Sequence, residues 1–266
     1  MLSPEAAALF DDVERLSGRD FRGYAEDSRE RVLGEVLAAE GLGSLDGLRL
    51  RLRSDGACLA RTLRALSVPA TSLFRDPSVF RALRERVVPH LATYPSIRVW
   101  VAGCASGEEA WSVAVLLREA GLLERSTVYA TDLNQELADG ARDGRYAPEV
   151  LAAGAAAWTA AGGGPLAAHL ADDGTRFAPE LAGRLVFAVH DLGSDAAFND
   201  FQLILCRNVM IYFEQALRAR TTMLLVESLA HLGILCLGAQ EALIPLPPGL
   251  RPFEPAHRLY RRTGAP

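Results

Sequence analysis

The stretch IRVWVAGCASGEEAWSVAVLL, residues 97–117, decides the fold of this chain. It opens with a run rich in Val, Ile and Trp, which predicts a buried strand, and after Glu109 its apolar residues recur at helical spacing. Residues 103–107 between them form a turn of small residues. Strand, glycine turn and helix are the first unit of a nucleotide-binding type of α/β domain, in which glycine lets the backbone approach a ligand closely. By itself, the turn fits an ordinary strand-to-helix connection equally well.

The charges beside this turn limit the kind of ligand. Glu108 and Glu109 in the first helical turn suit the helix dipole, but they repel phosphate, so we expect a ligand with an ammonium group rather than a pyrophosphate. The dinucleotide pattern G-x-G-x-x-G is absent, because three residues separate Gly103 from Gly107, and no Gly-Lys-Ser/Thr of a P-loop follows.

Composition narrows the class of protein. The chain has 266 residues, 50% of them hydrophobic, and a formal net charge of −5, which supports one large or two modest domains. Without a long basic run, nucleic acid and anionic membranes are poor candidates as partners. No apolar run reaches the roughly 18 residues of a membrane span, and the acidic N-terminus does not resemble a signal peptide. Four widely spaced cysteines indicate buried, reduced thiols in a cytoplasmic protein rather than a zinc site: Cys58, Cys104, Cys206 and Cys236.

The first part of the chain is expected to be a helical domain, residues 1–70, ahead of an α/β domain at 71–266. Apolar stripes at helical spacing occur within 9–16, 32–37 and 59–66, and Pro69 ends the last of them. The next segment, TSLFRDPSVF, is compatible with a helix-linking turn capped by Asp76. It is also compatible with a loop that covers a ligand pocket and points Arg75 into it.

Two further strands are predicted to end in acidic residues. The strand at 127–131 ends at Asp132, which fits an acid that holds ribose hydroxyls and, equally well, a helix N-cap. The strand at 185–189 ends at His190 and Asp191. A His–Asp pair suggests acid–base chemistry, but a strand-end turn is the favoured interpretation, and Asp191 could equally line the pocket.

The region between these strands is predicted to be irregular. Residues 152–164 are rich in Ala and Gly and are expected to form a mobile or weakly structured connection. The sequence Asp172-Asp173-Gly174 is a hairpin signal, so we expect a small β insertion at about 165–188.

The last third of the chain carries a polar segment beyond a buried strand. The strand at 201–205 continues into residues 206–213, which lie where ligands bind in open α/β sheets. Asn208 and Tyr212 supply neutral polar groups there and Arg207 supplies a charge. A helix at 214–232, a strand at 233–237, Glu241, a Pro-rich loop and an edge strand at 258–261 are expected to follow.

Several of these segments together resemble one family, the CheR-type chemotaxis receptor methyltransferases, which transfer a methyl group from S-adenosylmethionine to glutamate side chains of receptors. The matching segments are TSLFRDP, VWVAGCASGEEAWSVA, YATDLN with ARDGRY, FQLILCRNVMIYF and GILCLGAQEAL, in the family's order and over nearly the whole chain. The resemblance implies a class I methyltransferase fold, in which a Rossmann-like, mostly parallel sheet is joined to an N-terminal helical domain and a small β-subdomain insertion.

The resemblance also implies roles for single residues. Asp132 would hold the ribose hydroxyls, Asp191 and Leu192 would border the adenine, and Thr71 would close over the cofactor, with Gly103 of the turn beside it. At the methionine end, Glu109 would hold the ammonium group, lined by Arg207 and Asn208. Arg75 would also close over the cofactor, and with Tyr212 it would orient the acceptor carboxylate.

The implied reaction makes few demands on the protein. A glutamate carboxylate is already ionised at neutral pH, so its O-methylation needs positioning rather than a strong base, and no metal is expected. The expected product is S-adenosylhomocysteine. A catalytically silent cofactor-binding interaction module is the alternative, and a nicotinamide-dependent oxidoreductase is a third interpretation.

Four departures from the family pattern bear on these expectations. Pro69 stands where the family often has Asn, and Asp191 stands where it usually has Asn. The helix that is strongly basic in the family, thought to dock on the acidic receptor, is net acidic here, YAEDSRERVLGEVL. The β insertion, which in some relatives binds a receptor peptide by strand addition, is small and flanked by Ala and Gly.

Overall fold

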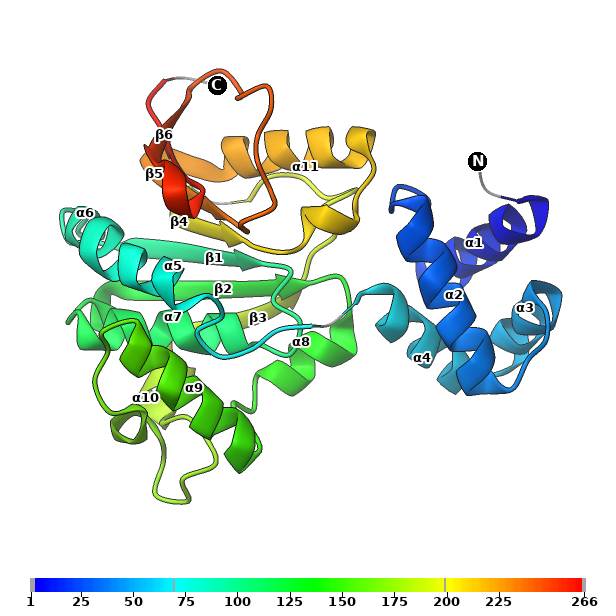
Figure 1. Ribbon diagram of the computed structural model, residues 1–266, viewed down its shortest axis with the longest axis horizontal. Coiled ribbons are helices and arrows are strands. Elements are labelled where there is room, and N and C mark those ends of the chain that lie inside the picture. The colour runs from blue at the N-terminus through cyan, green and yellow to red at the C-terminus, as the bar shows by residue number, and fades with distance from the viewer. Residues whose placement is uncertain (1–2, 69, 199, 265–266) are drawn as a thin grey trace.

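The computed structural model describes residues 3–68, 70–198 and 200–264, and its first helices form a separate bundle (Figure 1). The helical bundle consists of α1 (Pro4–Ser17), α2 (Glu26–Glu40), α3 (Leu45–Ser54) and α4 (Gly56–Leu66). Its apolar faces make a core of their own around Leu9, Phe10 and Leu48. The side chains of Ser44 and Asp55 accept hydrogen bonds from first-turn amides of α3 and α4, which fixes where these helices begin.

A seven-stranded sheet forms the centre of the α/β part, in the order β3-β2-β1-β4-β5-β7-β6. The strands are β1 (Ile97–Ala102), β2 (Ser126–Asp132), β3 (Leu185–Val189), β4 (Phe201–Cys206), β5 (Leu229–Leu237), β6 (Leu250–Glu254) and β7 (Leu259–Arg262). Neighbours among β1 to β5 pair in parallel, whereas β7 is antiparallel to both β5 and β6. This arrangement confirms the predicted class I methyltransferase fold.

Alternating side chains of the central strands bury both faces of the sheet. Val99 and Val101 of β1 pack into the cluster that includes α7 (Glu108–Glu119), and Trp100 and Ala102 pack into the cluster that includes α11 (Gln215–Ser228). The other α-helices are α5 (Pro77–Ala82), α6 (Val88–Leu91), α8 (Gln135–Ala141), α9 (Pro148–Ala160) and α10 (Pro179–Ala182), with a π-helical turn at Leu83–Val87. Short 3-10 turns lie at Leu123–Arg125, Leu166–His169, Met210–Tyr212 and Pro255–His257.

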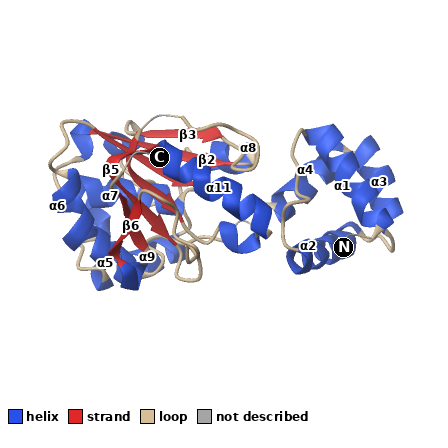
Figure 2. Ribbon diagram, turned by 90° about the horizontal axis from the view of Figure 1, so that it is seen from above, coloured by secondary structure: helices blue, strands red, loops and turns tan. Residues whose placement is uncertain are grey.

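The helical bundle faces the carboxyl ends of the parallel strands. The strand arrows in Figure 1 point toward it, and the turned view of Figure 2 shows the same separation between bundle and sheet. Because ligands of open parallel sheets bind beyond these strand ends, the bundle stands where it can cover a bound ligand. None of the helices in the described part of the chain is long and apolar enough to cross a membrane.

The expectation of a weakly structured connection at 152–164 is wrong. Pro148 begins α9, and alanine, the strongest helix former, carries it to Ala160. The helix is held by Trp158, whose ring stacks on Phe74 with centroids 4.6 Å apart, and by Gly154, where a Cβ would come within 2.8 Å of Leu73. The alanine-rich segment is therefore a helix, and it packs through its few large residues.

The β elements at both ends of the sheet also differ from expectation. The insertion at 165–188 is smaller than expected, because before β3 it contains only the bridges Leu170↔Phe177 and Arg145↔Arg176 around the Asp173 turn. The strand at 258–261 is not an edge strand, since β7 pairs with β5 on one side and with β6 on the other. Strand β6 is not predicted from the sequence, because it lies in the segment expected to be a Pro-rich loop. The departure at Pro69 lies outside the described residues.

Candidate cofactor site

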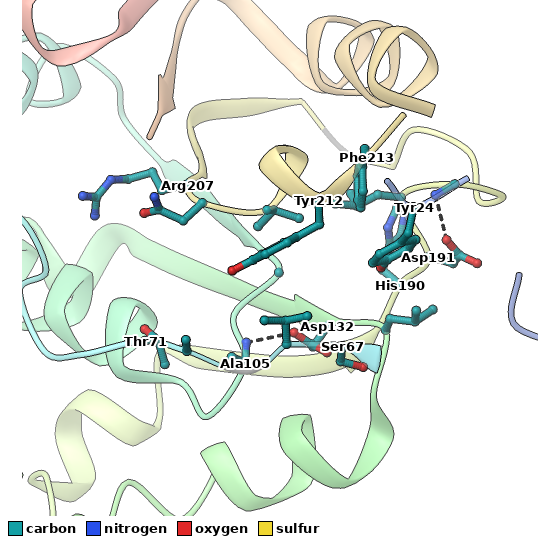
Figure 3. A pocket seen from close by; sticks show the side chains of 18 of the residues that line it. Tyr24, Ser67, Thr71, Ala105, Asp132, His190, Asp191, Arg207, Tyr212 and Phe213 are labelled. Carbon is teal, nitrogen blue, oxygen red and sulfur yellow. Dashed lines mark hydrogen bonds between the residues drawn. The ribbon is translucent and has the colours of Figure 1, made fainter. Parts of the chain in front are cut away.

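A pocket opens between the carboxyl ends of the strands and the helical bundle, and its two ends differ in chemistry (Figure 3). Arg207 lies at one end in this view and Asp191 at the other, with Asp132 and Tyr212 between them. The pocket lining includes all of the predicted site residues, Thr71, Arg75, Gly103, Glu109, Asp132, Asp191, Leu192, Arg207, Asn208 and Tyr212.

Asp132 at the middle of the pocket is a buried carboxylate aimed by backbone amides. Its Oδ2 accepts a hydrogen bond from the amide of Ala105 at 2.9 Å and its Oδ1 one from the amide of Asn134 at 2.9 Å. Burial raises the pKa of Asp132, and these amides oppose that rise. The alternative role as an N-cap belongs instead to Asn134, whose side chain accepts from the first amides of α8. Each oxygen of Asp132 retains lone pairs for hydroxyl donors of a ligand.

The charged end of the pocket is organised by a buried arginine. The side chain of Arg207 is 1% exposed; it donates to the carboxylate of Glu109 and, at 2.7 Å, to that of Asp76. Burial disfavours its charge, but the two carboxylates outweigh this and raise the pKa of Arg207. Glu108 points elsewhere, toward the hydroxyl of Ser106, which donates to it at 2.7 Å. Arg75 also lines the pocket, and its backbone carbonyl accepts a hydrogen bond from Arg207 at 3.0 Å. Charges of both signs therefore adjoin this end, which suits a zwitterionic amino-acid group.

The other end of the pocket is apolar and aromatic. Leu192 is buried at this end. The side chain of Asp191 bonds to its own loop, because its Oδ1 accepts a hydrogen bond from the amide of Gly193 at 2.7 Å. The ring centroids of His190 and Trp100 lie 5.2 Å apart. The Nε2 atom of His190 lies at hydrogen-bonding distance, 3.3 Å, from the carbonyl oxygen of Ala196. His190 thus packs in an aromatic cluster rather than pairing with Asp191, and the predicted strand-end turn accounts for both residues.

A second carboxylate shapes the loop that follows β4. Glu241 is buried, and its two oxygens accept hydrogen bonds from the amides of Asn208, Val209, Met210 and Gly238 at 2.7–2.9 Å. Asn208 is held at a φ of 59°, in the left-handed region, which Asn tolerates better than most residues with a side chain. Gly103 leaves room for the same loop, because a Cβ at this position would lie 2.5 Å from the side chain of Val209. The close approach that its sequence predicts is thus to the protein's own loop as well as to the pocket.

Sequence reasoning missed several residues of this site. The sequence predicts Asp76 only as a helix cap, but its side chain makes no cap hydrogen bond and instead accepts a hydrogen bond from Arg207. Tyr24 and Asp20 come from the helical bundle and line the pocket. No local pattern marks them, because a loop between two helices becomes part of the site only through tertiary packing. Glu241 has a local signal, because it is a lone acid four residues after the end of the buried strand β5.

The residues present fit an adenosyl amino acid. The aromatic end suits a purine ring, the buried Asp132 suits ribose hydroxyls, and the mixed charges around Arg207 suit an ammonium and a carboxylate. The side-chain oxygen of Asn208 is buried without a protein partner, which leaves it as an acceptor at the charged end. This fold and this pocket define an S-adenosylmethionine-dependent methyltransferase.

Comparisons with known proteins give the family. Residues 69–251, more than half of the chain, match the family model described as CheR methyltransferase, SAM binding domain. "Putative methyltransferase Cher3" of Pseudomonas putida is 39% identical over 84% of this chain and 83% of that protein. "Chemotaxis protein methyltransferase 1" of Pseudomonas aeruginosa is 29% identical over 81% of each chain. A methyltransferase structure from Geobacter sulfurreducens in complex with S-adenosyl-L-homocysteine is more distant, with 17% identity, a TM-score of 0.37 and coverage of 67% of this chain and 53% of that chain.

The chain therefore belongs to the CheR methyltransferase family, and S-adenosylmethionine is its cofactor. The resemblance carried by the sequence segments is confirmed by this match.

Proposed function

We propose that this protein transfers a methyl group to the side-chain carboxylate of glutamate in a chemoreceptor or a related signalling protein, and that it acts in the cytoplasm. Relatives named chemotaxis protein methyltransferase, from Pseudomonas aeruginosa and Listeria monocytogenes, support this acceptor. The observation that carries the proposal is that Arg75 and Tyr212 line the pocket that also contains Glu109 and Asn208. A cation and a phenol thus adjoin the end that suits the amino-acid part of the cofactor.

Within this proposal the pocket residues divide the work of binding. Asp132 accepts hydrogen bonds from the ribose, and Asp191 and Leu192 border the adenine. One oxygen of Glu109 is engaged by Arg207, so the other is the one offered to the ammonium group, beside the side-chain oxygen of Asn208. We assign Arg207 the role of holding Glu109 and Asp76 in place. We place Thr71, which lines the pocket from the linking segment, over the cofactor.

The reaction then depends on orientation. The bound cofactor supplies an activated methyl group, and an ionised glutamate is already a nucleophile, so the protein need not remove a proton. Arg75 presents a planar guanidinium that matches a carboxylate, and one of its nitrogens is anchored by donation to the carbonyl of Ala70 at 2.9 Å. Tyr212 is half-buried, lines the same pocket and offers a hydroxyl donor. These groups must align the carboxylate without holding it so tightly that the ground state is stabilised equally.

The decisive experiment is transfer of labelled methyl groups into a chemoreceptor cytoplasmic fragment that contains glutamates. We expect incorporation that is released as methanol in alkali, because carboxyl methyl esters hydrolyse there and N-methyl groups do not. Cofactor binding without transfer into any of a panel of receptor fragments would refute the proposal and favour the silent binding module.

Arg75→Ala tests the acceptor role directly. We expect at least about a tenfold loss of transfer, which corresponds to about 1.4 kcal/mol, with the affinity for S-adenosylhomocysteine changed less than about threefold. Arg251→Ala, at an exposed arginine on the far edge strand β6, is the matched control and should keep full activity. Equal activity of Arg75→Ala and wild type would exclude this role.

A further inference from the structure

The helical bundle contributes an aromatic side chain to the cofactor pocket. Tyr24 lies in the loop between α1 and α2 and lines the pocket together with Asp191 and Leu192. Figure 3 places its ring at the aromatic end, beside His190 and Asp191. Tyr24 precedes residue 69, where the match to the family model begins, so that match assigns it no role.

The loop that carries Tyr24 is joined to the loop that carries Tyr212 by backbone hydrogen bonds. Tyr24 and Phe213 form an antiparallel bridge, in which the amide of Ala25 donates to the carbonyl of Tyr212 at 2.7 Å and the amide of Glu214 donates to the carbonyl of Gly23 at 2.8 Å. The bundle is thus fastened to the α/β part at the edge of the pocket.

An ion pair between a buried arginine and an exposed glutamate joins the two parts at the same junction. Arg29 of α2 is 4% exposed, and it donates to the carboxylate of Glu214 at 3.0 Å and to the carbonyl of Arg22. The pair therefore joins the bundle to the residue that precedes α11. Phe213 also packs against Tyr24, with ring centroids 5.1 Å apart in an edge-on arrangement. Phe21 packs against the same ring with centroids 5.2 Å apart, so the ring of Tyr24 has two aromatic neighbours.

We propose that Tyr24 is a cofactor-binding residue that covers the adenosine part, and that the bridge and the Arg29–Glu214 pair form a latch that holds it there. An aromatic ring at the apolar end of the pocket offers the flat surface that a purine packs against. Burial and the nearby carboxylates of Asp191 and Asp132 raise the pKa of Tyr24, so its phenol stays neutral. This inference rests on the cofactor and not on the proposed acceptor.

Calorimetric titration of Tyr24 variants tests the binding role. Tyr24→Ala should bind S-adenosylhomocysteine about tenfold more weakly, and Tyr24→Phe, which keeps the ring, should stay within about threefold of wild type. 5′-Methylthioadenosine lacks the amino-acid part, and Tyr24→Ala should weaken its binding by the same factor. If Tyr24→Ala does not fold, Tyr24→Leu, which is still apolar but lacks the ring, should show the same loss.

Unchanged affinity of folded Tyr24→Ala or Tyr24→Leu would overturn the proposal. A loss seen with S-adenosylhomocysteine but not with 5′-methylthioadenosine would also overturn it, because Tyr24 would then act on the amino-acid end. Wild type that failed to bind either ligand would contradict the cofactor itself, and wild type that bound both but transferred no methyl group would contradict only the acceptor.

Glu214→Gln tests the latch without altering the pocket lining. We expect about a three- to tenfold weaker binding of S-adenosylhomocysteine, and little additional loss when it is combined with Tyr24→Ala, because both act through the same ring. Glu35→Gln is the matched control, since Glu35 pairs with Arg31 within α2 at 2.7 Å and, among the described residues, makes no ion pair with the α/β part. Equal affinities of Glu214→Gln and Glu35→Gln, or full additivity with Tyr24→Ala, would refute the latch.

Discussion

At the scale of single residues, the cofactor site depends on buried carboxylates that are each aimed by backbone amides. Asp132 and Glu241 both accept amide hydrogen bonds, but only Asp132 lines the pocket. A carboxylate has acceptor positions to spare when two amides bind it and none when four do. The first carboxylate is therefore available to a ligand, whereas the second is a structural part of the loop.

Asp132→Asn should weaken binding of S-adenosylhomocysteine by about tenfold, or about 1.4 kcal/mol, because the charge that attracts ribose hydroxyls is lost. Burial raises the pKa of Asp132 above its ordinary value of 3.8, so the wild-type affinity should decline as the pH falls toward that raised pKa. Calorimetry over this range should show no such decline in the variant. Equal affinities of variant and wild type near neutral pH would exclude the ribose role.

Glu241→Gln should lower the free energy of unfolding by roughly 2–3 kcal/mol. An amide side chain keeps one acceptor oxygen, so two of the four amides that Glu241 binds would face an NH₂ group instead. Urea denaturation measures the change, and Glu227→Gln, at an exposed position of α11, is the control that should shift it by less than about 0.5 kcal/mol. A similar small shift for Glu241→Gln would mean that these hydrogen bonds contribute little.

At the scale of elements, a buried carboxylate joins two helices of the bundle. Asp12 of α1 accepts from Arg49 at 3.0 Å and from Arg53 at 2.7 Å, and these two residues are one helical turn apart on α3. Burial alone would raise the pKa of Asp12, but the hydrogen bonds from Arg53 and Arg49 outweigh it and lower the pKa.

This pairing predicts acid sensitivity of the bundle. A carboxyl whose pKa is lower in the folded state stabilises the fold above its unfolded pKa of about 3.9, and this contribution is lost as the pH falls through the lower folded pKa. Unfolding free energies measured from about pH 6 downward should therefore drop below about pH 4 in wild type. Asp12→Asn should be less stable at neutral pH and should show a smaller drop, because other carboxyls with a lowered pKa, such as Asp20 and Glu119, also contribute to it. Asp46→Asn, at an exposed surface pair with Arg49, should behave like wild type. A drop of equal size in Asp12→Asn would assign it to other carboxylates.

The elements that could be predicted are those whose pattern is local. The strands β1, β2 and β4 are buried on both faces and read as continuous apolar runs, and the glycine turn after β1 marks the site. Helix α9 could not be predicted because its alanines form no apolar stripe. Strand β6 could not be predicted because it contains Pro252 and directly follows a proline-rich segment, and both are typical of loops. Within the site, Asp132 and Arg207 stand at strand ends, where a pattern marks them, whereas Tyr24 reaches the pocket only through the packing of the bundle.

At the scale of the whole molecule, the net negative charge and the acids of α2 affect how the proposed acceptor approaches. The chain has a formal net charge of −5. Helix α2 carries exposed acids, among them Asp27, Glu30 and Glu35, and it directly follows the loop from which Tyr24 lines the pocket. An acidic receptor fragment would meet repulsion there, whereas the family's basic helix would attract it.

Salt should therefore affect methyl transfer in the direction opposite to that of electrostatic attraction. Raising the ionic strength from about 0.01 to about 0.1 M shortens the Debye length from roughly 30 to roughly 10 Å, so repulsion is screened and the KM for an acidic receptor fragment should fall. Glu30→Arg with Glu35→Arg should lower the KM at low salt and weaken this dependence, while the affinity for S-adenosylhomocysteine stays constant. A KM that instead rises with salt in wild type would mean that the acceptor docks through attraction to a basic surface elsewhere on the molecule, and α2 would then have no part in choosing it.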